Sequence, residues 1–240
     1  MRVGFIVQGL PGEGYHGGPL TCWSVVRELI RSGHQVCVIS LFDVTEGNPY
    51  LKSRGQQEAA LRREGAEVVV IEYAMEALTG ARSHDPLAKF GRWIGRICSA
   101  PDGLAYLMPW VKLAEEVRRA LAGREFDGFL CYHFDALAAV HPLCLSPMLA
   151  VVGDLWHLPG YFRWREGSFS LSKYAVRGIR VALESMIAER AMSTLLASTT
   201  SCGAFAGHYA EWLKAHGFPK TLYFRTPVPD AAGPPWELLR

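Results

Sequence analysis

The chain has 240 residues, of which 50% are hydrophobic and 20% are charged, and its formal net charge is +2. This composition excludes a disordered chain, a collagen, a coiled coil and a small disulfide-bonded scaffold. The near-neutral balance also argues against a nucleic-acid partner, because dedicated nucleic-acid binders usually carry a clear basic excess.

The first part of the sequence alternates short apolar runs with amphipathic segments. Strands are predicted at 3–7, 36–41 and 68–71, and helices at 19–31 and 56–64. Each helix is followed by a glycine, Gly33 or Gly65, which suits a left-handed helix end. The two helix–glycine–strand junctions align with each other, so we interpret them as one α/β unit used twice.

The same alternation continues to residue 224. Further strands are predicted at 126–132, 148–152, 194–197 and 221–224, and helices at 111–121, 176–191 and 201–216. Strands that alternate with helices predict an α/β fold, here a doubly wound, mostly parallel, seven-stranded Rossmann-like sheet. We assign residues 1–225 to this domain and the proline-rich residues 226–240 to an interdomain linker or tail.

The cysteines and the apolar segments indicate the compartment. None of the six cysteines belongs to a CxxC pair, and most lie in apolar runs, as Cys37 and Cys131 do. This is typical of buried free thiols in a reducing compartment. No segment has the pattern of a signal peptide. Residues 129–152 are apolar but contain Asp135, Pro142 and Pro147, so buried strands explain them better than a membrane span. We expect a cytoplasmic protein.

A glycine-rich loop at 9–19 separates the first strand from the first helix. Glycines let a backbone approach a ligand closely, and a helix N-terminus attracts anions, so a phosphate or diphosphate is the expected guest. The plainer alternative is a surface turn. Residues 12–17 spell GxGxxG, but the helix begins too late for a dinucleotide fingerprint, and Asp43 lies too far along for the ribose-binding acid. An NAD(P)-dependent oxidoreductase is therefore a weaker alternative.

Several segments together carry a resemblance to a known family. Gly17-Gly18-Pro19, the Gly-His-x-Val strand within 31–39, the segments 126–133 and 184–198, and the junction at 226–230 occur in the order of the N-terminal domain of glycosyltransferase family 4. The segment 184–198 resembles a helix and the sixth strand of the family, and Ser198 then corresponds to a serine that follows this strand. The family comprises retaining sugar transferases with two facing Rossmann-like domains, the GT-B fold. The resemblance implies hexosyl transfer from a nucleotide-diphosphate sugar to a hydroxyl acceptor, with no metal or separate cofactor, in polysaccharide or glycolipid biosynthesis.

The resemblance also implies roles for individual residues. Gly17 and Gly18 would bind the donor diphosphate, and His133 would be the catalytic residue beside the transferred sugar. Asp154 is expected to bind an acceptor hydroxyl, and Tyr15 and His16, at the tip of the loop, to contact the donor or acceptor. Independently of the resemblance, the aromatic and basic residues of 156–165 predict acceptor or sugar contacts from Trp156 and Arg163, with simple loop packing as the alternative. A core histidine and a helix cap are the plainer interpretations of His133 and Asp154. Gly153 stands where related sequences often have a histidine.

The donor-binding half has no counterpart in the sequence. The family's E-x7-E motif belongs to its second domain, and Glu64 and Glu72, which share that spacing, lie in a different setting. We therefore expect a missing C-terminal domain or a partner subunit, and an inactive isolated chain. The main alternative is a non-catalytic subunit of a split transferase that binds the acceptor or a membrane. A basic amphipathic segment at 86–98 would allow peripheral contact with the inner membrane face, unless it is an ordinary surface helix.

Overall fold

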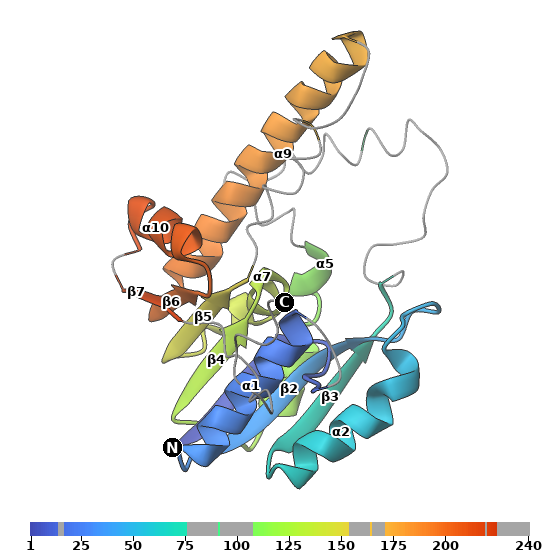
Figure 1. The fold of residues 1–240 in the computed structure, drawn as a ribbon, viewed down its shortest axis with the longest axis vertical. Coiled ribbons are helices and arrows are strands. Elements are labelled where there is room, and N and C mark those ends of the chain that lie inside the picture. The colour runs from blue at the N-terminus through green and yellow to red at the C-terminus, as the bar shows by residue number, and fades with distance from the viewer. Residues whose placement is uncertain are drawn as a thin grey trace, which may run out of the picture.

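The computed structural model describes residues 1–13, 17–75, 91, 108–153, 164, 171–218 and 220–224. Their core is one open sheet of seven parallel strands in the order β3-β2-β1-β4-β5-β6-β7 (Figure 1). The strands are β1 (Arg2–Gln8), β2 (Gln35–Asp43), β3 (Glu67–Tyr73), β4 (Gly128–Tyr132), β5 (Met148–Val152), β6 (Ser201–Ala204) and β7 (Thr221–Tyr223). The predicted seven-stranded Rossmann-like α/β fold is confirmed.

Helices cover both faces of the sheet. One face carries α1 (Gly18–Arg31) and α2 (Arg54–Arg63), preceded by the 3-10 turn η1 (Leu51–Ser53). The other carries α5 (Met108–Val111), α6 (Ala114–Leu121), α7 (Phe134–Val140), the 3-10 turn η3 (His141–Leu143), α9 (Leu171–Ala197) and α10 (Gly207–Ala215). Neighbouring residues of β1 show the two layers, because Phe5 packs in the core under α1 and Ile6 packs in the core under α7 and α9.

The connections turn back once, between β1 and β4. The chain runs outward from β1 to β3, returns to β4 on the other side of β1, and then runs outward to β7. In the register of the sheet, Val7 lies opposite Ser40 on one side and opposite Tyr132 on the other. The carboxyl ends of β1 and β4 therefore lie side by side, at the point where open α/β sheets bind their ligands.

The sixth strand was predicted in the wrong place. Residues 194–197 form the last turn of α9, whereas β6 is Ser201–Ala204 and α10 begins only at Gly207. Met192, Leu195 and Leu196 are almost completely buried and pack against the sheet from the helix. A short apolar run of this kind fits a buried strand and a buried helix turn equally well, which explains the error.

Two helices also differ from their predicted lengths. The helix predicted at 111–121 is divided into α5 and α6, and α9 extends beyond the predicted 176–191 at both ends. With its 27 residues α9 is about 40 Å long, and it projects well beyond the sheet (Figure 1). The predicted helix ends at Gly33 and Gly65 are confirmed, with positive φ angles of 82° and 99°.

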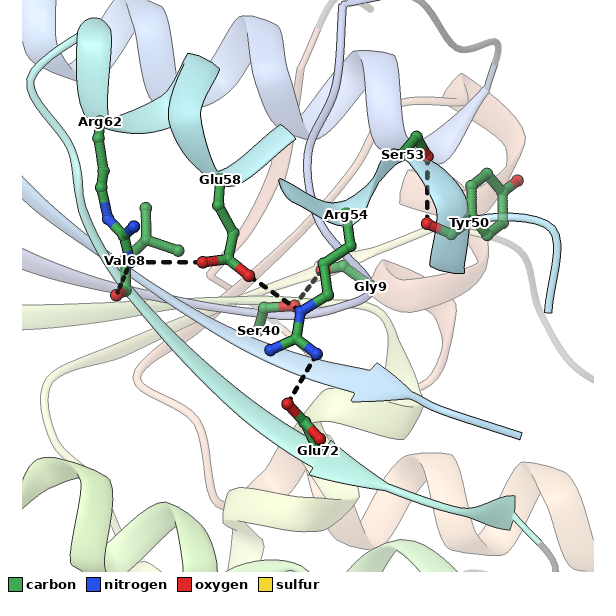
Figure 2. Close-up of polar contacts among 9 residues, drawn as sticks. All are labelled: Gly9, Ser40, Tyr50, Ser53, Arg54, Glu58, Arg62, Val68 and Glu72. Carbon is green, nitrogen blue, oxygen red and sulfur yellow. Dashed lines mark hydrogen bonds and ion pairs between the residues drawn. The ribbon is translucent and has the colours of Figure 1, made fainter. Parts of the chain in front are cut away.

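A polar network fastens α2 to the neighbouring strands (Figure 2). The guanidinium of Arg54 donates to Glu58 (Nε–Oε1 2.9 Å) and pairs with Glu72 of β3 (Nη1–Oε1 2.6 Å). The same group lies 5.3 Å from the ring centre of the buried Phe42. These contacts fix the position of α2, whose Gln57 reaches the loop that follows β1.

The described cysteines agree with the prediction of free thiols. Four of them, Cys22, Cys37, Cys131 and Cys202, are buried and unbridged, and Cys144 is exposed and also free. In the described ranges no helix combines the length and the apolar character that a membrane crossing requires.

Candidate functional site

A pocket of about 180 Å³ lies where the carboxyl ends of β1 and β4 meet the start of α1. Its walls come from the end of β1 and the following loop (Val7, Gln8, Leu10, Pro11), from α1 (Gly18, Pro19, Cys22) and from the end of β4 (Tyr132, His133). The pocket therefore lies where the strand order reverses, between β1 and β4. The connections that follow these two strands lead away in opposite directions, and a crevice remains between them. Two of the residues predicted from the sequence, Gly18 and His133, are thereby brought together.

The loop after β1 is held by buried polar groups. The Ser40 hydroxyl donates to the Gly9 carbonyl at 2.7 Å (Figure 2), and the Gly9 N–H donates to Leu41 at 2.8 Å. The Gln57 amide donates to the Leu10 carbonyl at 3.5 Å. Ser40 and Gln57 are almost completely buried, so they act from inside the protein. The described start of the loop is therefore positioned before any ligand arrives.

The beginning of α1 presents a backbone suited to an anion. Gly17 is the N-cap residue, with φ 69° and ψ −133°, a conformation that disfavours any residue with a Cβ atom. Its carbonyl accepts from the N–H and the hydroxyl of Thr21, at 3.0 and 3.1 Å. The N–H groups of Gly18 and Leu20, in the first turn, have no acceptor within the helix itself. The first turn contains no acidic residue, so nothing in it offsets the positive end of the helix dipole.

His133 lies opposite this helix end. It is the N-cap residue of α7 with a φ angle of 75°, and its backbone N–H donates to the Val151 carbonyl at 2.9 Å. Its Nδ1 lies 3.7 Å from a carboxylate oxygen of Asp135. A Cβ atom at Gly153 would lie 2.9 Å from the imidazole Cδ2. The departure seen at Gly153 therefore has a structural reason, since the glycine leaves room for the His133 ring.

The thiol and the phenol near the pocket are neutral groups. Burial raises the pKa of Cys22, which lines the pocket, far above its usual range, so this thiol is no nucleophile at physiological pH. Gln8 donates to the Tyr73 hydroxyl at 3.2 Å, and burial is the main cause that raises the pKa of Tyr73 to about 12. Besides Cys22, the lining side chains that carry polar atoms are those of Gln8, Tyr132 and His133.

The other residues predicted to contact the acceptor or sugar lie outside the part of the chain that the structure describes. They are Tyr15, His16, Asp154, Trp156 and Arg163, and residues 226–240 and, apart from Gly91, the segment 86–98 lie outside it as well. Within the described part of the chain no three His, Cys, Asp or Glu side chains are arranged to hold a metal ion.

The prediction that Ser198 follows the sixth strand is also wrong. Ser198 follows α9 and precedes β6, so it lies near the amino ends of the strands and away from the pocket; its Oγ lies 3.1 Å from Nδ1 of His141. The residue that follows β6 is Phe205, whose ring centre lies 6.2 Å from that of Tyr132. The error follows directly from the misplaced strand, because Ser198 would reach the site only if 194–197 were a strand.

Sequence reasoning missed several residues that shape the pocket. Tyr132 and Gln8 line it, while Ser40 and Gln57 hold the loop from the side of β2 and α2. The one available signal is Ser40, a polar residue inside an otherwise apolar strand. A buried hydroxyl requires a hydrogen-bond partner, so its presence indicates a contact with a neighbouring backbone.

The fold is shared with glycosyltransferases of the GT-B type. The calicheamicin glycosyltransferase CalG4 superimposes with a TM-score of 0.51 and 13% identity, over 96% of this chain and 56% of that one. The glycotransferase of kitacinnamycin gives 0.48 and 14%, over 96% and 52%, and UGT89C1 of Arabidopsis thaliana, complexed with UDP, gives 0.43 and 12%, over 100% and 54%. The chain therefore spans about half the length of these structures. No protein-family model matches the sequence, and a comparison with curated proteins gives no match either.

Proposed function

We propose that this chain is the N-terminal, acceptor-side half of a glycosyltransferase that moves a sugar from a nucleotide-diphosphate donor to a hydroxyl acceptor. The observation that carries the proposal is the pocket at the strand reversal, which has a helix N-terminus on one side and His133 on the other. The first favours an anionic group, and the second can hydrogen-bond a sugar or an acceptor hydroxyl. The resemblance of the sequence to glycosyltransferase family 4 supports the same function.

In this reaction the bond between the anomeric carbon and the diphosphate oxygen breaks, and the acceptor oxygen forms the new bond. Negative charge grows on the leaving diphosphate, so fixed N–H groups lower the barrier without reorganising. The N–H groups at Gly17 and Gly18 take this role, while His133 lies beside the transferred sugar. The reaction needs no resident metal or cofactor in this mechanism, since the helix end supplies the compensating positive charge.

A second half completes the site. Pockets that enclose a small molecule usually measure about 300–1,000 Å³. The pocket of about 180 Å³ is smaller than this, as expected if it is one part of a larger cleft that a second half completes. Ile179 and Met186, seven residues apart on the projecting α9, are 64% and 51% exposed and offer apolar contact to another domain or subunit. The donor's base is then recognised by that second half.

The stereochemical outcome has two candidates. Family 4 enzymes retain the anomeric configuration, and the sequence resemblance supports retention. The pair of His133 and Asp135 favours inversion instead, because a carboxylate close to an imidazole is the usual arrangement of a general base. In that case His133 takes the proton of the acceptor hydroxyl as the oxygen attacks the anomeric carbon.

The function is tested by replacing His133 in a protein that contains both halves. If His133 is the general base of an inverting reaction, His133→Ala is expected to lower the rate of sugar transfer by about 10²–10⁴-fold, the usual loss when a proton-transfer group is removed. His141→Ala is the matched control. His141 does not line the pocket, so this variant is expected to keep the wild-type rate. Proton NMR of the product distinguishes retention from inversion. Full activity of His133→Ala would show that His133 has no role in sugar transfer.

Two other functions remain as alternatives to the proposal. A non-catalytic subunit would bind an acceptor or a membrane surface without ever transferring sugar. An NAD(P)-dependent oxidoreductase is disfavoured by the loop, because nine residues separate the end of β1 at Gln8 from the start of α1 at Gly18. Dinucleotide-binding loops are shorter and lead directly into the helix. A cytoplasmic location, with peripheral contact at the inner membrane face through 86–98, also belongs to the proposal.

A further inference from the structure

Three half-buried aromatic side chains form a row that starts in the pocket. Tyr132 ends β4 and lines the pocket, Phe205 follows β6, and Phe224 follows β7. The ring centres of Tyr132 and Phe205 are 6.2 Å apart, and those of Phe205 and Phe224 are 5.9 Å apart. The planes are tilted by 46° and 48°. These distances and tilts lie within the range of favourable aromatic contacts, so the three rings form one continuous wall.

The row lies on the face of the sheet that carries α1. In β6, Cys202 and Ala204 point into the core under α9 and α10, so Gly203 between them points to the opposite face. A Cβ atom at Gly203 would collide with the ring of Phe224. Tyr132 belongs to the cluster under α1 and is in contact range of Gly18, whose added Cβ would lie 3.8 Å from its ring. The glycine in β6 thus lets the aromatic wall continue from the pocket across the sheet.

The chemistry of this wall is apolar. The three side chains together carry one polar atom, the hydroxyl of Tyr132. A sugar acceptor has several hydroxyl groups, and each one left without a partner when it is buried costs stability. A planar aromatic compound with one hydroxyl group has only that group to satisfy, and it gains from ring contacts with Phe205 and Phe224.

We propose that this wall binds the acceptor, and that the acceptor is a planar aromatic compound that carries a hydroxyl group. The inference rests on the proposed transferase function for the role of the bound compound. Binding along the wall places the hydroxyl at the Tyr132 end, next to His133 and the beginning of α1. Phe205 and Phe224 are then specificity-determining residues for the acceptor.

The test uses 2-naphthol as the probe, with titration of the purified chain followed by ligand-observed NMR. Saturable binding is expected, with methyl β-D-glucoside and the non-planar cyclohexanol bound at least about tenfold more weakly. Phe205→Leu, which keeps apolar volume but removes the ring, is expected to weaken 2-naphthol binding by about tenfold, as is Phe224→Leu. Tyr223→Leu is the matched control, since this neighbouring side chain is 58% exposed, and it keeps the wild-type affinity.

The result that would overturn the proposal is equal affinity of wild type and both phenylalanine variants for 2-naphthol. Stronger binding of the glucoside than of 2-naphthol would overturn it equally. Inorganic pyrophosphate, titrated into the same samples, separates this inference from the proposed function. Ring-dependent naphthol binding without pyrophosphate binding would leave the aromatic site standing and contradict the donor site. Pyrophosphate binding without naphthol binding would do the reverse.

Discussion

Gly17→Val is expected to weaken the binding of inorganic pyrophosphate by at least about tenfold and to lower sugar transfer by about 10²–10³-fold in a protein that contains both halves. Gly17 has a positive φ angle of 69°, which a β-branched residue adopts only with strain of about 1–3 kcal/mol. The loop relieves this strain by changing the backbone at the start of α1. The N–H groups that bind the diphosphate then turn away from it.

The fold is expected to survive this change, because no heavy atom lies within 4 Å of a Cβ atom placed at Gly17. Gly123→Val is the matched control. Gly123 has a φ angle of 72° and equally open surroundings, but it lies between α6 and β4 at the other edge of the sheet. This control also places a β-branched residue at a positive φ angle and should keep wild-type pyrophosphate affinity. If both variants lost affinity to the same extent, general destabilisation would explain the effect and the loop would have no special role.

Phe5→Ala is expected to lower the free energy of unfolding by about 3–5 kcal/mol. Phe5 lies in the central strand β1, between Val38 of β2 and Leu130 of β4, and its side chain is completely buried. Removing the ring leaves a cavity under α1 that the parallel sheet cannot fill by a small shift. The total stability of a domain is usually about 5–15 kcal/mol, so the variant should be close to unfolded.

Urea unfolding followed by circular dichroism measures this loss. Leu222→Ala in β7 is the control, because Leu222 is 47% exposed and should change the unfolding free energy by less than about 1 kcal/mol. A loss below about 1 kcal/mol for Phe5→Ala would contradict the assignment of β1 to the centre of the core.

Most of the sheet could be predicted because its strands are buried on both faces. Runs such as 36–41 and 148–152 are almost uninterrupted apolar sequences, and buried parallel strands have this character. The sixth strand could not be predicted in the same way. Ser201–Ala204 is short and contains a serine and a glycine, whereas the preceding leucines of α9 are more apolar. The glycine that weakens the strand pattern is the one whose missing side chain accommodates Phe224.

Part of the candidate site was indicated by local patterns and by resemblance. A glycine-rich loop before a helix and the resemblance to glycosyltransferase family 4 pointed to Gly17 and Gly18, and the resemblance pointed to His133. The structure brings Gly18 and His133 to the same pocket. Ser40 and Gln57 act through contacts with Gly9 and Leu10, 31 and 47 positions away in the sequence. Such contacts exist only after the sheet and α2 have assembled. The polar Ser40 inside an apolar strand indicates that it has a partner, but no local pattern shows that the partner is the Gly9 carbonyl. The same holds for the row formed by Tyr132, Phe205 and Phe224.

The central claim is that the beginning of α1 binds the diphosphate of the donor. It is tested most directly by an amide ¹⁵N–¹H NMR titration of the wild-type chain with inorganic pyrophosphate. The account predicts saturable shifts that are largest for the N–H groups of Gly17, Gly18 and Leu20, together with a shift at His133 on the other side of the pocket. Shifts confined to residues away from these positions, or no saturable shift at all, would contradict it.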